Sequence, residues 1–238
     1  MVIYKDMEEL IYTYIFNLSD GKEKRFCVRL NSETLNCVQP KEIVNPEWTK
    51  LEYAQCRNCP LTASQYEFCP IAVNLVEAIA FFKDSISYEN VDVLVKTKER
   101  DIFAKTTIQK GLSSLMGIYM VTSGCPIMEK LKPMVYQHLP FASPEETVYR
   151  ATSMYLLGQY FLNKEGKTPD WELCGLVKIY EEIRIVNQDM CKRIRDAASE
   201  DASVNAVVIL NVFADMLPFS IEKSLNRLKH LFSSYLSL

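Results

Sequence analysis

The sequence predicts an α+β protein in which a small N-terminal antiparallel sheet packs on a larger helical body. Residues 9–107 contain two pairs of short segments rich in β-branched and aromatic residues, and a tight connection joins each pair. From residue 108 onward, apolar residues recur only at helical spacing. We therefore expect a sheet region at 1–107 and a helical region at 108–238, either as two domains or as one continuous domain.

The two segment pairs are expected to form β-hairpins. Segments 9–18 and 24–31 flank an Asp-Gly turn, and apolar residues alternate with polar ones in the second segment. Segments 91–97 and 101–107 flank the connection Lys-Glu-Arg. Two hairpins give a small antiparallel sheet, and a cysteine-rich loop and one helix lie between them in the sequence.

The apolar pattern also predicts the helices. The helix that opens at Cys69-Pro70 has so wide an apolar surface that it should be deeply packed. Two glycines in the following helix, Gly111 and Gly117, should let another backbone approach closely. The later helices are expected at 108–122, at 125–136 after a break, from Ser143 to about Gly166, from Thr168 over about seven turns, and at 202–236.

Local signals mark some helix ends. Ser143 is the expected N-cap of its helix, Pro144 follows in the first turn, and Glu146 completes a Ser-x-x-Glu capping box. The last helical segment should bend or break at Pro218, because proline lacks the N–H group that a helix interior needs.

Composition limits the class of protein. The 238 residues are 48% hydrophobic and 24% charged, as in an ordinary globular protein. A net charge of −3 gives no reason to expect a nucleic-acid partner, and the basic stretches 22–25 and 191–196 are expected at the solvated surface. No apolar run reaches the ~18–20 residues of a membrane span, and the N-terminus lacks the pattern of a secretory leader. We expect a cytoplasmic protein without a membrane or nucleic-acid partner.

Three of the eight cysteines lie in one loop, within the stretch QCRNCPLTASQYEFCP at 55–70. Cys56 and Cys59 have the spacing at which two thiolates converge on one ion from a tight turn. Cys69 follows ten residues later. We expect Cys125 to be the fourth ligand because it, like Cys59 and Cys69, precedes a proline, whereas the composition predicts only about 0.3 such pairs.

A physical reason connects these Cys-Pro pairs to metal binding. Proline favours the first position of a helix, which places the preceding cysteine at the N-cap. There the helix dipole and the free N–H groups favour the thiolate over the thiol. Cys69 and Cys125 should each open a helix and be predisposed to bind metal or to react as nucleophiles.

The sequence leaves three interpretations open: zinc, an iron–sulfur cluster, or no bound metal. Four cysteines suit tetrahedral zinc, which would hold together a loop with little apolar content. Cysteine followed by proline also occurs in some iron–sulfur ligand runs. Cysteines that bind no metal pack as small hydrophobes. His138, in a predicted loop between two helices, is the alternative fourth ligand.

The remaining candidates carry weaker signals. Neither histidine has a catalytic motif around it: His138 is a potential acid or base in a cleft, and His230 is expected at a helix surface. An enzyme that used His138 with the polar residues of the second hairpin would need a pocket with a carboxylate beside that histidine. The cysteines expected to be packing or surface residues are Cys27, Cys37, Cys174 and Cys191.

Four stretches together resemble an uncharacterised family of soluble bacterial proteins with a CxxC…CP and SGCP cysteine pattern. They are PEWTKLEYAQCRNCPL, FCPIAVNL, GLSSLMGIYMVTSGCPIM and HLPFASPEET, and they cover roughly residues 46–165. The resemblance implies a bacterial cytoplasmic origin and no particular reaction.

The leading functional prediction is a non-enzymatic interaction or regulatory module with a structural metal site at Cys56, Cys59, Cys69 and Cys125. Its partner would be another protein or a second copy of the chain, since the long amphipathic helices offer a homodimer face. The alternative prediction is an iron–sulfur or thiol redox sensor or enzyme, which should show colour, oxygen sensitivity or a thiol with a low pKa.

Overall fold

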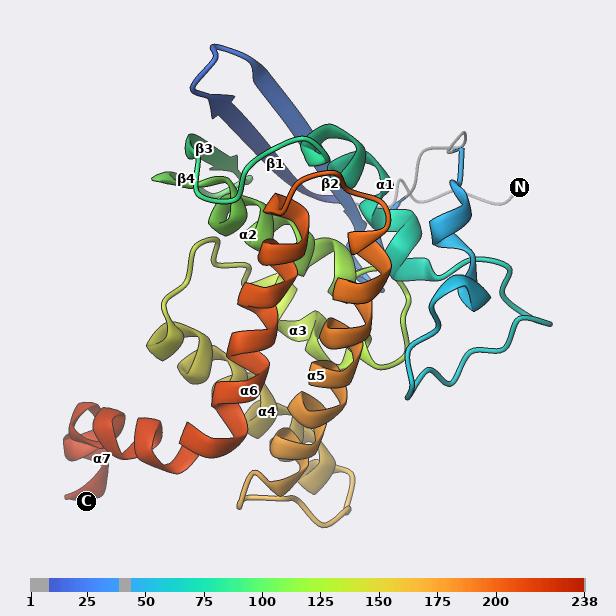
Figure 1. Ribbon diagram of the computed structural model, residues 1–238. Helices are drawn as coiled ribbons and strands as arrows, with labels where there is room; N and C mark the ends of the chain where they lie inside the picture. Colours follow the sequence, from blue (N-terminus) through green and yellow to red (C-terminus); the bar gives the residue numbers. More distant parts are fainter. Residues whose placement is uncertain (1–8, 39–43, 238) are drawn as a thin grey trace, which may run out of the picture.

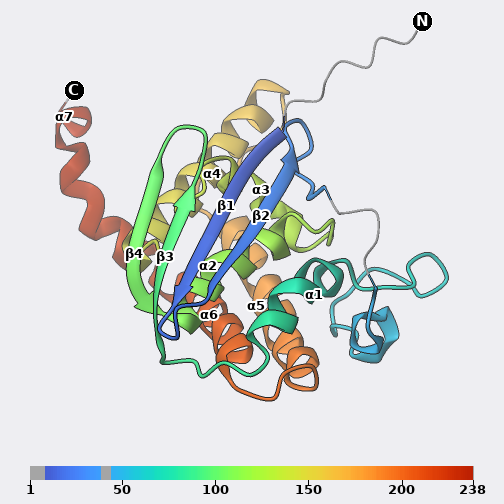
Figure 2. The ribbon, with the colours of Figure 1, turned by 90° about the horizontal axis from the view of Figure 1, so that it is seen from above.

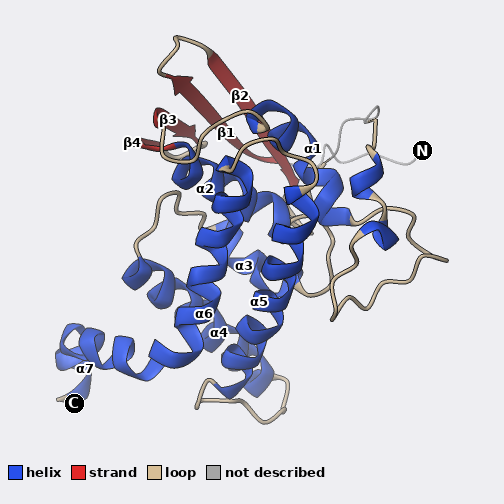
Figure 3. Cartoon of the chain, viewed as in Figure 1, coloured by secondary structure: helices blue, strands red, loops and turns tan. Residues whose placement is uncertain are grey.

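The computed structural model describes residues 9–38 and 44–237, and it has the predicted α+β fold (Figure 1). A small sheet lies at one end of the molecule, and helices make up the larger body (Figure 3). Residues 1–8, where the chain was expected to lack a secretory leader, lie outside the described residues. In the described part of the chain, no helix combines the length and the apolarity that crossing a bilayer requires.

The sheet consists of the two predicted hairpins, which are confirmed. It is antiparallel throughout, and its strand order is β2-β1-β3-β4. Alternate residues of β1, among them Tyr12, Tyr14 and Phe16, are buried and face the helices, which cover one side of the sheet (Figure 2). The strands are β1 (Glu9–Leu18), β2 (Glu23–Asn31), β3 (Asn90–Lys96) and β4 (Asp101–Thr107).

Helices α5 and α6 pack along each other in the body, and α6 also packs on α2 (Figure 1). The end of α6 and the short elements after it extend away from the body (Figure 1). The α-helices are α1 (Pro70–Phe82), α2 (Ile108–Val121), α3 (Lys132–Tyr136), α4 (Pro144–Lys164), α5 (Cys174–Arg195), α6 (Ala202–Leu228) and α7 (Ser233–Leu236). The 3-10 helices are η1 (Glu47–Thr49), η2 (Leu51–Tyr53), η3 (Met128–Leu131) and η4 (Lys229–Phe232).

One hydrophobic core joins the sheet to the helices. It includes Phe16 and Val93 from the sheet, Phe82 from α1 and Leu112 from α2, so its members come from both sides of residue 107. Gly111 lets α2 lie close to the sheet: a Cβ atom there would be 3.0 Å from side-chain carbons of Phe16 and Val93. The nearest atoms at this glycine are side chains and not the backbone that was expected. The deep packing of α1 is confirmed. The division into domains stays a prediction.

The start of α4 is as predicted. The Ser143 hydroxyl accepts the N–H of Glu146, and the Glu146 carboxylate accepts the N–H of Ser143. This reciprocal pair satisfies two N–H groups that the first helical turn leaves without a partner.

The predicted start of the next helix at Thr168 is wrong. Helix α5 begins at Cys174 instead. Asp170 accepts the N–H of Gly175 and the hydroxyl of Tyr155, and Leu173 has a left-handed backbone with φ of 62°. The Asp170 carboxylate thus organises a turn before the helix. From sequence propensity alone, this turn is mistaken for the first turn of the helix.

The last long helix was expected to bend or break at Pro218. It does not break, because α6 is continuous from Ala202 to Leu228, but it changes direction along its course (Figure 1). One other expectation is wrong. Cys125 does not open a regular α-helix. It is followed by a turn and then by the short 3-10 helix η3 at Met128–Leu131.

Candidate metal centre and central cavity

The structure brings the four predicted cysteines into one neighbourhood, which we call the thiol cluster (Cys56, Cys59, Cys69 and Cys125). Cys56 and Cys59 belong to the cysteine loop (residues 54–69), Cys69 is the N-cap of α1, and Cys125 follows α2. Burial raises the pKa of the Cys56 thiol to about 12, and the other three thiols each add to that increase. The three segments that carry the cluster therefore lie within electrostatic reach of one another.

The thiols do not surround a common point. With the side chains as they stand, no three His, Cys, Asp or Glu residues in the described part of the chain form a group placed to hold a metal ion. Zinc–sulfur bonds are about 2.3 Å long. Ligation would thus require some of these side chains to adopt other χ1 rotamers.

Backbone N–H groups point at two of the sulfurs. The N–H groups of Ala72 and Ile71, at the start of α1, lower the pKa of the Cys69 thiol, although the thiol makes no capping hydrogen bond. The N–H groups of Met128 and Ile127 act on the pKa of the Cys125 thiol in the same direction. Both cysteines begin the sequence Cys-Pro-Ile, so the same local chain path directs two donors at each sulfur.

Burial nevertheless outweighs these donors. It is the largest influence on both thiols, and the pKa of Cys69 and of Cys125 is raised overall. The expectation that the helix N-terminus makes these thiols acidic is therefore wrong for the metal-free chain. Without a metal ion they are protonated at neutral pH.

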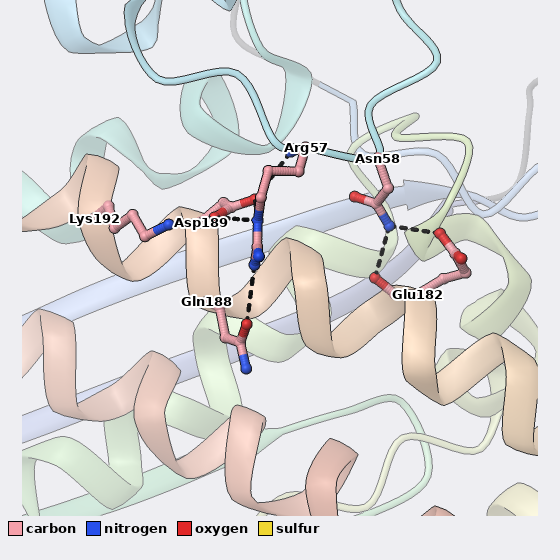
Figure 4. Close-up of polar contacts among 6 residues, drawn as sticks. All are labelled: Arg57, Asn58, Glu182, Gln188, Asp189 and Lys192. Atoms are coloured by element: carbon pink, nitrogen blue, oxygen red, sulfur yellow. Dashed lines mark hydrogen bonds and ion pairs between the residues drawn. The ribbon is translucent and has the colours of Figure 1, made fainter.

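The cysteine loop is fixed to α5 by the two residues between Cys56 and Cys59 (Figure 4). The backbone N–H and the Nε of Arg57 both donate to Asp189, at 2.9 and 3.1 Å. The Asn58 amide donates to the carboxylate of Glu182 at 2.6 Å. Burial alone would raise the pKa of Asp189. The hydrogen bonds from Arg57 and Lys192 outweigh this effect, so the pKa of Asp189 lies below the usual value. The carboxylate stays charged and holds the CxxC turn.

A second anchor from α5 holds the segment before the loop. The Arg193 side chain is fully buried, and its guanidinium donates to the carbonyls of Trp48, Lys50 and Leu51 at 2.6, 2.6 and 3.0 Å. The prediction that the basic stretch 191–196 is solvated surface is wrong for this residue. Arg193 lies three residues after Met190, on the buried side of α5. This helical spacing was the signal in the sequence that Arg193 is buried.

His138 lines a partly open cavity of about 600 Å³ between the helical body and strand β4 of the second hairpin. Its Nε2 atom is hydrogen-bonded to the Tyr14 hydroxyl, which also contacts the Ser114 hydroxyl at 2.9 Å. Burial, and to a smaller extent the charge of Arg150, lowers the pKa of His138 to about 3. The ring is therefore neutral at physiological pH, and metal binding through Nε2 would cost it the bond to Tyr14.

The cavity matches the pocket expected of a His138 enzyme only in part. Thr106, from the polar group on the second hairpin, does line it. However, none of the described residues that line it is an aspartate or a glutamate, so no carboxylate stands beside the histidine in the cavity wall.

The comparisons with known proteins establish the family. Residues 10–233 match a domain of unknown function, DUF6901. The chain belongs to this family. Comparisons with curated proteins and with solved structures gave no match. The resemblance to an uncharacterised family is thereby confirmed, and the DUF6901 match takes in the sheet, the thiol cluster and the cavity.

Sequence reasoning found the DUF6901 cysteines and His138 but missed their surroundings. The Tyr14 hydroxyl reaches His138 from more than 100 residues away, Ser114 in turn contacts that hydroxyl, and nothing in their own segments marks either residue. Arg150 falls on α4 among ordinary surface residues. Glu146 lies four residues earlier at the spacing of an ordinary surface ion pair, so the sequence gives no signal for this residue.

Proposed function

We propose that this DUF6901 chain is a non-enzymatic interaction or regulatory module of the bacterial cytoplasm, in which a zinc ion fastens the cysteine loop to the helical body. The ligands are Cys56, Cys59, Cys69 and Cys125. One observation carries the proposal: thiols from three segments, separated by up to about 70 residues of sequence, influence one another's ionisation. The partner is another protein or a second copy of the chain, and the proposal involves no nucleic acid or membrane.

The loop itself supports a structural role for the ion. Residues 54–69 contain little regular structure, and most of their side chains are at least partly exposed. A loop of this kind cannot hold itself together by burying apolar surface, so a metal ion contributes to its folding. The anchors Arg57–Asp189 and Arg193 already hold the loop and the segment before it on α5, which lowers the entropy cost of closing the site.

The choice of zinc rests on the donor set. Four sulfur donors without an open position suit a structural tetrahedral site. Because the thiols must lose their protons to bind, and burial raises the pKa of Cys56 to about 12, zinc affinity should increase with pH.

The alternative proposal is an iron–sulfur cluster or a thiol redox centre at the same residues. Reactive thiols normally have a depressed pKa. The thiols of Cys56, Cys69 and Cys125 have the opposite shift, which favours the structural proposal over thiol chemistry. An iron–sulfur cluster, in contrast, uses the same ligands and needs an experiment to separate it from zinc.

Purification without oxygen, followed by elemental analysis and a visible absorption spectrum, distinguishes these proposals. We expect about one zinc per chain, no colour, and loss of both the zinc and several degrees of thermal stability in Cys56→Ser. Cys27→Ser is the matched control, because Cys27 is an exposed thiol on β2. Iron with a visible absorption band would support the cluster instead. If Cys56→Ser kept the metal content and the stability of the parent protein, both metal proposals would be wrong.

A further inference from the structure

The central cavity has the dimensions of a small-molecule site. Its volume of about 600 Å³ lies within the roughly 300–1,000 Å³ typical of such sites. Strand β4 and the helices α2, α4, α5 and α6 all contribute to its wall, together with the segment from η3 to α4. Because so many elements form its wall, the shape of the cavity depends on the packing of the whole fold and not on the conformation of a single loop.

The wall is mostly apolar. Side chains such as Leu131, Ile183 and Phe213 line it from three different elements. Such a wall gains free energy when an apolar ligand body displaces water from it.

The charged groups at the cavity are all cationic. Lys105 and Lys110 are exposed and line the cavity from β4 and α2, whereas Arg150 lines it from α4 and is half-buried. The described lining residues include no acidic side chain. The cavity therefore presents positive charge to an occupant.

Arg150 is the most informative of these cations. Its Nη2 atom donates to the carbonyls of Met134 and Gln137 at 2.7 and 2.9 Å, which fixes the guanidinium in place. Its Nε atom is buried without a hydrogen-bond partner among the described residues. Burial lowers the pKa of Arg150, and the opposing effects of Tyr180 and of the Glu146 carboxylate, which is not among the cavity-lining residues, are smaller.

Neutral polar groups complete the lining. His138 is uncharged at physiological pH. It can therefore form hydrogen bonds in the cavity, but it does not compete with Arg150 for an anionic group. The Asn187 side chain is 1% exposed and lines the cavity, and its Oδ1 atom has no partner in the described part of the chain. Buried polar atoms normally have a partner, so this amide indicates an occupant or ordered water.

We propose that the central cavity binds a small carboxylic acid with an apolar body, whose carboxylate pairs with Arg150 and whose body fills the apolar wall. Because Nη2 already donates to two backbone carbonyls, the carboxylate pairs with the remaining donors of the guanidinium, Nε and Nη1, through charge-assisted hydrogen bonds. This inference goes beyond the proposed zinc site and does not depend on it.

Titration calorimetry with three molecules of equal chain length tests the proposal directly on the parent protein. Decanoate, decanol and decyltrimethylammonium share one apolar body and differ in the charge of the head group. We expect decanoate to bind about tenfold or more tightly than decanol, as expected for a hydrogen-bonded charge, and the cation to bind least. No binding of decanoate, or equal binding of decanoate and decanol, would overturn the proposal.

Two variants locate the binding in the cavity. Arg150→Gln should reduce decanoate affinity to that of decanol, while Arg25→Gln, an exposed arginine on β2, should leave it unchanged. Ala142→Trp places a large side chain at the cavity wall and should weaken decanoate and decanol together. Retained head-group selectivity in Arg150→Gln would refute the role of Arg150. If that variant does not fold, the Ala142→Trp titration decides, because unchanged decanoate affinity in it would place binding elsewhere.

Discussion

Replacing Arg193 by alanine should destabilise the protein far more than replacing an exposed arginine or lysine. The side chain is fully buried, and it supplies donors to three backbone carbonyls of residues 48–51. Alanine would remove all three hydrogen bonds and leave a space that the guanidinium fills. The carbonyls of Trp48, Lys50 and Leu51 would then need other donors.

The contacts set the expected magnitude. A hydrogen bond to a charged group contributes about 1.5–3 kcal/mol, and a buried carbonyl left without a partner costs about 1–3 kcal/mol. The sum of three such terms is an upper bound, because η1 and η2 are short and can shift toward water. We expect a loss of about 3 kcal/mol in the free energy of unfolding. For a chain of 238 residues this corresponds to a decrease in Tm of roughly 6–12 °C.

Urea unfolding followed by circular dichroism measures the free energy, and hydrogen exchange reports on residues 47–53. Arg195→Ala is the matched control, because Arg195 is exposed on the same helix two residues further on. Arg193→Lys keeps the charge without the planar fork and should give an intermediate loss. A loss below about 1 kcal/mol for Arg193→Ala, or one equal to that of Arg195→Ala, would refute the anchoring role.

Three further predictions follow from local geometry. Gly111→Ala should lower the free energy of unfolding, measured by heat or urea, by about 1–2 kcal/mol, because the added Cβ would lie 3.0 Å from buried side chains of β1 and β3. The control Gly158→Ala in α4 places its Cβ where no atom lies within 4 Å, and it should stabilise the protein. Ser143→Ala should cost about 1 kcal/mol through loss of the capping box, and Ser153→Ala, at an exposed position of the same helix, should be neutral or slightly stabilising; equal effects would contradict the capping argument. The pKa of His138, about 3 in the folded state, is below its unfolded value of about 6.5, so its contribution to stability is present above pH 6.5 and is lost as the pH falls toward 3. Between pH 7 and pH 5, the parent protein should therefore lose up to about 2 kcal/mol more than His138→Asn in urea unfolding, and parallel pH profiles would count against the buried neutral ring.

The sequence predicted those parts of the fold that depend on local patterns. Both hairpins follow from alternation and short connections, and the start of α4 follows from a capping box between Ser143 and Glu146. The start of α5 was mispredicted because Asp170 uses its side chain on a turn instead of a helix. Side-chain hydrogen bonds of this kind compete with helix formation, and propensities do not show which will prevail.

The surroundings of the candidate sites depend on contacts between distant segments. The cysteine spacing pointed to a cluster, but the groups that hold it, Asp189 and Arg193, come from a helix more than 100 residues later. The raised pKa of Cys56, to about 12, results from burial, which has no signature in a single segment. The cavity was anticipated only through His138, because its volume arises from the way in which the helices meet.

The strand order also has a consequence for the kinetics of folding. Each hairpin closes through a short turn, but the seam between β1 and β3 pairs Leu18 with Val91, about 70 residues later in the chain. Closing a segment of that length costs about 2.5 kcal/mol more chain entropy than closing a four-residue turn. The two hairpins should therefore form early and the seam late, after α1 has become ordered between them. Pulse-labelling hydrogen exchange would report this sequence of events as earlier protection of the β1–β2 and β3–β4 amides than of the amides that cross the seam.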